Sequence, residues 1–101
     1  MIYAILKING KENAYLFDTW NDYIDATFNV SIEQICIIEL GKISGQTYLE
    51  KQNCLQQKAI EYSNNIVSGL DMFELNQIAE YFERYGRRYG LLTEFKENAI
   101  C

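Results

Sequence analysis

Six carboxylates stand between Lys11 and Lys42, and no basic side chain interrupts them. They are Glu12, Asp18, Asp22, Asp25, Glu33 and Glu39. Carboxylates can serve as the acid and base of a hydrolysis, or they can present negative charge to a cationic partner. The stretch carries a charge of −6 in a chain whose net charge is −5, so the remainder is close to neutral. This concentration predicts a negative field over one region of the molecule.

Most side chains that catalysis requires are missing from the chain. There is no histidine, which excludes Ser-His and Cys-His nucleophile pairs and His-ligated metals. No C-x-x-C pair could hold zinc, and the six glycines never form a phosphate-binding loop. Two carboxylates alone could hydrolyse a glycoside, but a domain of 101 residues rarely forms a substrate cleft as well as a core. We therefore expect no enzyme, no catalytic residue, no cofactor and no metal, but a protein that occupies a site meant for a polyanion.

Length and composition indicate one folded domain over residues 1–101. Hydrophobic residues make up 49% of the chain, too many for a disordered acidic tail. No apolar run approaches the roughly 18 residues that cross a bilayer, and the first residues lack the charged start of a secretion signal. Cys36, Cys54 and Cys101 have no paired spacing, which indicates free thiols in a reducing compartment. We expect a cytoplasmic protein without membrane contact.

The N-terminal part, residues 1–41, has the pattern of three strands around one helix. Residues 2–8 alternate apolar side chains, Asn9-Gly10 supplies turn chemistry, and residues 14–17 return as a second strand. Residues 11–13 are also polar, so a turn longer than two residues is an alternative. A third strand is expected over residues 34–40, and its apolar side chains on both faces place it in the centre of the sheet.

The segment from Asp18 or Thr19 to Asn29 has helical spacing. Its apolar positions recur at three and four residues and predict a buried stripe of Trp20, Tyr23, Ile24, Thr27 and Phe28. The opposite side carries Asp18, Asp22 and Asp25, which fall within about 60° of one another at ~100° per residue. Side chains at these spacings stand ~5–6 Å apart, close to the spacing of successive phosphates in a nucleic-acid strand. Asp18 and Thr19 also suit a helix start, which gives a purely structural reason for one of the acids.

The C-terminal part, residues 42–101, is predicted to be helical. The pairs Thr47/Glu50 and Asp71/Glu74 are capping boxes that open helices over residues 47–62 and 72–85. The second helix has a clear apolar stripe of Met72, Leu75, Ile78, Ala79, Phe82 and Tyr85. We expect a helix stop at Gly86, a short edge strand at residues 66–67 and a last helix over residues 91–98. The fold class is therefore α+β, with a small antiparallel sheet of about three strands packed against three to four helices.

Residues 70–86, with the sequence LDMFELNQIAEYFERYG, resemble a segment of the antirestriction protein ArdA family. In that family segment, an acidic residue and two further residues precede E-L-N-x-[LI]-A-E. A further Glu and the end of a helix follow. Residues 15–18 with the acidic helix are similar to the family's short strand ending in Asp and its acidic helix. Residues 35–39 resemble the next strand of the family, which ends in an acidic step.

The resemblance implies a non-catalytic inhibitor encoded on a phage or plasmid and acting in the host bacterial cytoplasm. Members of the family imitate the phosphates of bent DNA, so that type I restriction–modification enzymes bind the decoy. The implied partner is a host defence enzyme, either a restriction complex or a CRISPR effector, without direct nucleic-acid binding; a homodimer is left open. The implied partner-binding acids are Asp18, Asp22, Asp25, Glu33, Glu39, Glu74, Glu80 and Glu83.

Two alternatives belong to other classes of function. Six tyrosines exceed what a core of this size buries comfortably, which favours a small protein-interaction module with a tyrosine-rich surface. They are Tyr3, Tyr15, Tyr48, Tyr62, Tyr81 and Tyr89. The second alternative is direct nucleic-acid binding through Arg84, Arg87 and Arg88. The net charge of −5 opposes it, and the position of these arginines favours capping of a helix end and pairing with Glu80 and Glu83.

Overall fold

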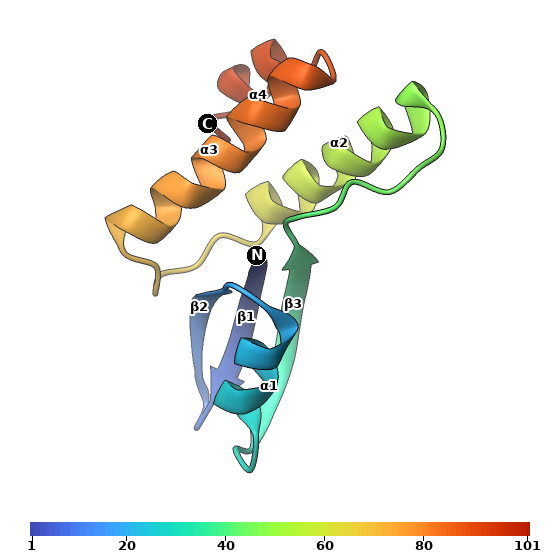
Figure 1. Ribbon diagram of the computed structural model, residues 1–101. Helices are drawn as coiled ribbons and strands as arrows, with labels where there is room; N and C mark the ends of the chain where they lie inside the picture. The colour runs from blue at the N-terminus through green and yellow to red at the C-terminus, as the bar shows by residue number, and fades with distance from the viewer.

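A computed structural model describes residues 1–101, and the chain has an α+β fold of three antiparallel strands and four helices. The strands are β1 (Ile2–Ile8), β2 (Lys11–Phe17) and β3 (Ile32–Glu39). The helices are α1 (Trp20–Thr27), α2 (Tyr48–Asn64), α3 (Met72–Arg88) and α4 (Leu92–Glu97). In Figure 1, α1 lies against the sheet, whereas α2, α3 and α4 gather at the end where β3 finishes. The molecule is elongated, with extents of 41 × 27 × 20 Å.

A tight hairpin joins the first two strands, as the sequence predicted. Asn9 and Gly10 both have positive φ angles, 54° and 80°, and β1 pairs with β2 from Ile8 and Lys11 onward. Positive φ at both central residues is the geometry that matches the twist of a two-residue hairpin. The polar residues 11–13 therefore belong to the strand, and the longer turn does not form.

β1, not β3, is the central strand, so the predicted position of β3 was wrong. The strand order is β2-β1-β3, with both pairings antiparallel. Residues 2–6 are all buried, because β1 has a neighbour on each side and cover on both faces. β3 is an edge strand, and its register shifts near Ile35, which stays 43% exposed. Both β1 and β3 have apolar side chains on both faces, so this pattern does not show which of them is the central strand.

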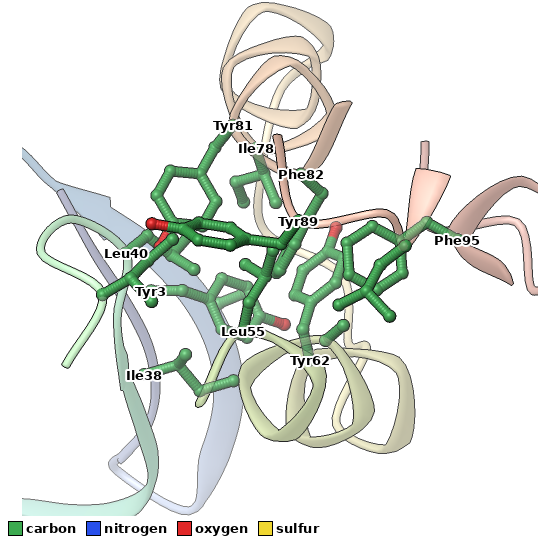
Figure 2. Close-up of a cluster of buried hydrophobic side chains, with 14 of the residues drawn as sticks. Tyr3, Ile38, Leu40, Leu55, Tyr62, Ile78, Tyr81, Phe82, Tyr89 and Phe95 are labelled. Carbon is green, nitrogen blue, oxygen red and sulfur yellow. The ribbon is translucent and has the colours of Figure 1, made fainter. Parts of the chain in front are cut away.

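A row of aromatic rings joins the sheet to all three C-terminal helices. The ring of Tyr3 on β1 meets Tyr62 on α2 at 5.0 Å, and Tyr62 meets Phe82 on α3 at 5.6 Å. Phe82 in turn meets Phe95 on α4 at 5.6 Å. Figure 2 shows these rings pointing toward one another from their different elements. The buried cluster around them therefore draws on both the N-terminal and the C-terminal parts of the chain.

Both predicted capping boxes are present and fix the starts of the long helices. The Thr47 hydroxyl accepts a hydrogen bond from the Glu50 N–H (3.2 Å), and the Glu50 carboxylate accepts one from the Thr47 N–H (3.4 Å). At α3 the Asp71 carboxylate accepts from the Glu74 N–H (2.8 Å), and Glu74 accepts in return from Asp71 (3.1 Å). These bonds satisfy N–H groups that have no partner inside the helix.

Gly86 does not end α3, which corrects the sequence prediction. The helix continues to Arg88, and the positive φ angle of 72° lies at Gly90 instead. Gly86 is needed for close packing, because a Cβ atom there would lie 2.8 Å from Cδ2 of Phe95. A further difference concerns residues 66–67, which form no strand. The Ser68 carbonyl nevertheless accepts one hydrogen bond from the Ala14 N–H at the outer edge of β2 (3.0 Å).

We expect Gly86→Ala to destabilise the fold. Overpacking against the buried Phe95 ring costs about 1–3 kcal/mol, and the better helix propensity of alanine returns about 1 kcal/mol. Urea unfolding measures the net loss, which should be on the order of 1 kcal/mol. Gly41→Ala is the matched control, because nothing lies within 4 Å of a Cβ atom at Gly41. A higher unfolding midpoint for Gly86→Ala would contradict the packing role.

Stability should fall in alkali because of the buried Tyr3 hydroxyl, which donates to the Asn65 carbonyl at 2.7 Å. Burial raises the pKa of Tyr3 from 10.0 to about 12. The folded state holds this proton more tightly than the unfolded chain, so stability is fully present below pH 10.0 and is lost as the pH rises toward about 12. Unfolding free energies measured across this range should fall less steeply for Tyr3→Phe. Equal pH dependence in the two proteins would exclude this cause.

Candidate functional site

The acids of the first helix are exposed, but only two of them lie on it. The helix begins at Trp20 with Thr19 as its cap, and the Thr19 hydroxyl accepts a hydrogen bond from the Asp22 N–H (3.2 Å). Asp18 therefore precedes the cap in the connection from β2, which corrects the predicted row of three on one helix. Asp22 and Asp25 stand on the outer side of α1, about 60° apart around its axis.

The three aspartates have no cationic partner. The structure contains a single ion pair, between Arg87 and Glu83 at 3.1 Å on α3. The carboxylates of Asp18, Asp22 and Asp25 are consequently free to contact another molecule. Asp22 also lies in the first turn of α1, where a negative charge stabilises the helix end. This contribution to helix stability does not require the Asp22 carboxylate to turn inward, so it stays exposed.

The remaining predicted acids do not join the α1 carboxylates in one surface. In the register of β3 with β1, Glu33 is opposite Lys7 and so lies on the sheet face of Tyr3, whereas Glu39 is opposite Ile2 on the other face. That opposite face is the one α1 covers, since Phe17 is in register with Ile2 and contacts Tyr23 of α1. Of the predicted acids outside the 18–25 segment, Glu39 alone therefore shares the side of the sheet that α1 occupies.

The acids of α3 have local partners or lie apart from α1. The Glu74 carboxylate is used in the capping box with Asp71, and Glu83 is paired with Arg87. Glu80 is exposed and borders a shallow hollow that Arg84 also lines. Figure 1 shows α3 beyond the end of the sheet where β3 finishes, while α1 lies along the sheet. Of the eight acids that the resemblance implies, only those near α1 therefore lie close together.

The predicted buried stripe of α1 is wrong, because the helix buries no residue. Trp20 is 42% exposed, Ile24 54% and Phe28 71%, while Tyr23 and Thr27 are half-buried. Tyr23 meets the Phe17 ring edge-on at 5.5 Å, and Trp20 meets Tyr23 at 5.7 Å. The helix has only eight residues and touches the sheet along one narrow side. The apolar spacing identified the helix but not the part of its stripe that the sheet would cover.

We call the exposed carboxylates and large apolar side chains of this helix and its C-cap the α1 surface. It consists of Trp20, Asp22, Ile24, Asp25 and Phe28. It combines carboxylates with large apolar side chains that follow one another at four-residue steps, and a contiguous exposed apolar patch commonly marks an interaction site. Sequence reasoning missed the apolar members. The apolar spacing gave no signal of this exposure, because it does not show whether the fold covers the stripe.

The tyrosines do not form the surface that the sequence predicted. Four of the six are buried: Tyr3, Tyr62, Tyr81 and Tyr89. The hydroxyls of Tyr3 and Tyr81 donate to backbone carbonyls, at 2.7 Å and 3.3 Å. Both side chains are therefore buried without leaving a hydroxyl that lacks a hydrogen-bond partner. Tyr15 is half-buried, and Tyr48 is the one exposed member of the set. Hydrogen bonds to loop carbonyls, which no pattern in the sequence indicates, allow this burial.

The arginines near the end of α3 fit the predicted structural role. Arg87 and Arg88 lie in its last turn, where positive charge suits the helix dipole. Arg87 pairs with Glu83, and the Arg88 guanidinium lies 5.7 Å from the centre of the Tyr89 ring. The predicted pairing of Glu80 with a cation does not occur within 4.0 Å.

Other features that could hold a ligand are modest. A hollow of about 200 Å³ lies between α2 and α4, and there Glu94 accepts hydrogen bonds from the Gln56 amide at 3.1 and 3.2 Å. No three His, Cys, Asp or Glu side chains come close enough together to bind a metal ion. None of the helices has both the length and the apolar character of a membrane span.

Comparisons with protein-family models, with curated proteins and with solved structures find no match to this chain. The candidate site is therefore defined only by the geometry of the α1 surface in this fold. The resemblance of residues 70–86 to the ArdA family stays a prediction.

Proposed function

We propose that the protein is a non-catalytic inhibitor of a bacterial defence enzyme that handles nucleic acid, and that it occupies the enzyme's polyanion site. The observation that carries the proposal is the exposure of unpaired carboxylates on α1. Asp22 and Asp25 project from one side of a helix at the ~5–6 Å spacing expected of neighbouring positions. A channel lined with Lys and Arg would meet them as it meets successive phosphates.

The distribution of charge supports the same reading. Residues 1–41 contain six acids and two lysines, a charge of −4, and residues 42–101 contain eight acids and seven bases, a charge of −1. The negative field is therefore strongest over the sheet and α1. Long-range attraction from such a field raises the rate of encounter with a cationic partner.

Within this proposal, the acids have unequal roles. Asp18, Asp22 and Asp25 make the contact, and Glu39 adds charge on the same side of the sheet. Glu33, Glu74, Glu80 and Glu83 do not take part directly, because they lie on other faces or have local partners. The target is a restriction complex or a CRISPR effector in the cytoplasm of a bacterial host, and the gene is carried by a phage or plasmid.

Competition for DNA tests the proposal. The wild-type protein should release a labelled DNA duplex from a purified type I restriction–modification complex or from a DNA-targeting CRISPR effector, as fluorescence anisotropy would report. Release should occur without any cleavage or modification of the DNA. Failure to displace DNA from either enzyme would contradict the proposed function.

A second candidate is an interaction module that uses no polyanion mimicry. The exposure of Trp20, Ile24 and Phe28 favours it, since these side chains could support a contact without charge. The two candidates differ in the importance of the carboxylates. Under the second candidate, neutralising Asp22 and Asp25 would leave partner binding intact.

A further inference from the structure

We propose that α1 docks into a groove on its protein partner that has an apolar floor and a cationic rim. The inference rests on the proposed function and adds a second component to the contact. Three apolar side chains follow one another by four residues along the helix and its cap, and all three are exposed: Trp20, Ile24 and Phe28. We call them the apolar ridge. Pure imitation of a phosphate backbone would give these side chains no role.

The ridge adjoins the carboxylates. At ~100° per residue, Ile24 and Asp25 lie about 100° apart on α1, and Asp25 and Asp22 about 60° apart. Tyr23 and Thr27, which face the sheet, lie on the other side of the ridge and are half-buried. The order around the helix is therefore sheet contact, apolar ridge and carboxylates. A partner that reaches the carboxylates from this side also meets the ridge.

Apolar anchors repeated along one helix face are the pattern of a helix bound in a hydrophobic groove. Charge complementarity then defines the rim of that groove, since Asp22 and Asp25 require Lys or Arg opposite them. The same charges disfavour two other occupants. An anionic lipid surface would repel the carboxylates, and a second copy of the chain would bring two acidic helices together.

Separate removal of the two components tests the inference. The ridge variant is Ile24→Ser with Phe28→Ser, and its matched control is Met72→Ser with Phe73→Ser. Both control residues are exposed apolar side chains at the start of α3. The charge variant is Asp22→Asn with Asp25→Asn. The dissociation constant of each protein for the enzyme that the wild type displaces from DNA is measured at several salt concentrations.

The ridge variant should bind at least about tenfold more weakly, with the slope of log Kd against log salt unchanged. The charge variant should bind more weakly with a shallower slope, and the α3 control should bind like the wild type. Urea unfolding of each variant checks the fold. Phe28→Ser alone, a change outside the α-helical residues, serves if the double ridge variant is unfolded.

Wild-type binding by the ridge variant, together with weak binding by the charge variant, would overturn this inference and leave the proposed function standing. A ridge variant that loses both affinity and salt dependence would also overturn it, because the ridge would then only position the carboxylates. Unchanged binding by the charge variant would overturn the cationic rim and the proposed function together. The absence of wild-type binding to either enzyme would have the same result.

Discussion

Phe82→Ala is expected to lower the free energy of unfolding by about 3–5 kcal/mol. The Phe82 side chain is fully buried at the centre of the core. Its ring contacts those of Tyr62, Tyr81 and Phe95, at centroid distances of 5.6, 5.2 and 5.6 Å. Alanine would leave a cavity where α2, α3 and α4 meet. A protein of this size is stable by about 5–15 kcal/mol, so the variant should be unfolded or nearly so at moderate urea concentrations.

Phe73→Ala is the matched control for this substitution. The residue is on the same helix and is the same type, but its side chain is 71% exposed. Its unfolding free energy should stay within about 0.5 kcal/mol of the wild type. Similar losses for the two variants would show that the row of rings from Tyr3 to Phe95 is not the centre of stability.

Charge reversal on α1 should have the largest effect on function. Asp22→Lys with Asp25→Lys is expected to weaken binding to the target enzyme at least about 100-fold, since each reversal removes a charge-assisted contact and adds a like-charge repulsion. The fold should be retained, because both side chains are exposed, neither makes an ion pair, and the helix-end contribution of the Asp22 charge is only about 0.3–1 kcal/mol. Anisotropy competition with labelled DNA measures the loss of inhibition, and circular dichroism verifies the helix content.

Glu61→Lys with Glu97→Lys is the matched control for net charge. It changes the charge of the protein by the same amount, and both glutamates are exposed on other helices, α2 and α4. This control should keep most of its inhibition. Equal losses for the two double variants would mean that overall charge matters and that the α1 surface is not a specific site.

The sequence predicted those parts of the fold that depend on local chemistry. Asn9-Gly10 allows the positive φ angles of a two-residue turn, and the Thr47 and Asp71 caps act on backbone groups only three residues away. These features need no knowledge of distant contacts. The sheet, the four helices and the α+β class followed from them and from the apolar spacing.

The errors concern contacts between residues that are far apart in the chain. The order of β1 and β3 depends on which strand gains two neighbours, and both have apolar side chains on each face. The role of Gly86 depends on the approach of Phe95 from α4. The burial of Tyr3 and Tyr81 depends on carbonyl acceptors at Asn65 and Gly41. None of these partners can be identified from spacing alone.

The same distinction between local features and long-range contacts applies to the candidate site. The exposure of Asp22 and Asp25 was predicted from their positions opposite an apolar stripe, whereas Asp18 is exposed in the connection before the helix. The exposure of Ile24 and Phe28 was not predicted, because a helical stripe indicates which side is apolar and not whether the fold covers it. A helix of eight residues on a three-stranded sheet leaves part of its stripe open.

The salt dependence of binding tests the central claim most directly. Contacts that replace phosphates release counterions, so the affinity of the wild-type protein for its target enzyme should fall steeply between ~50 and ~200 mM salt. Asp22→Asn with Asp25→Asn should make this fall clearly shallower. An affinity that is flat across this range, or a slope that the two substitutions leave unchanged, would contradict the claim that carboxylates on α1 stand in for a polyanion.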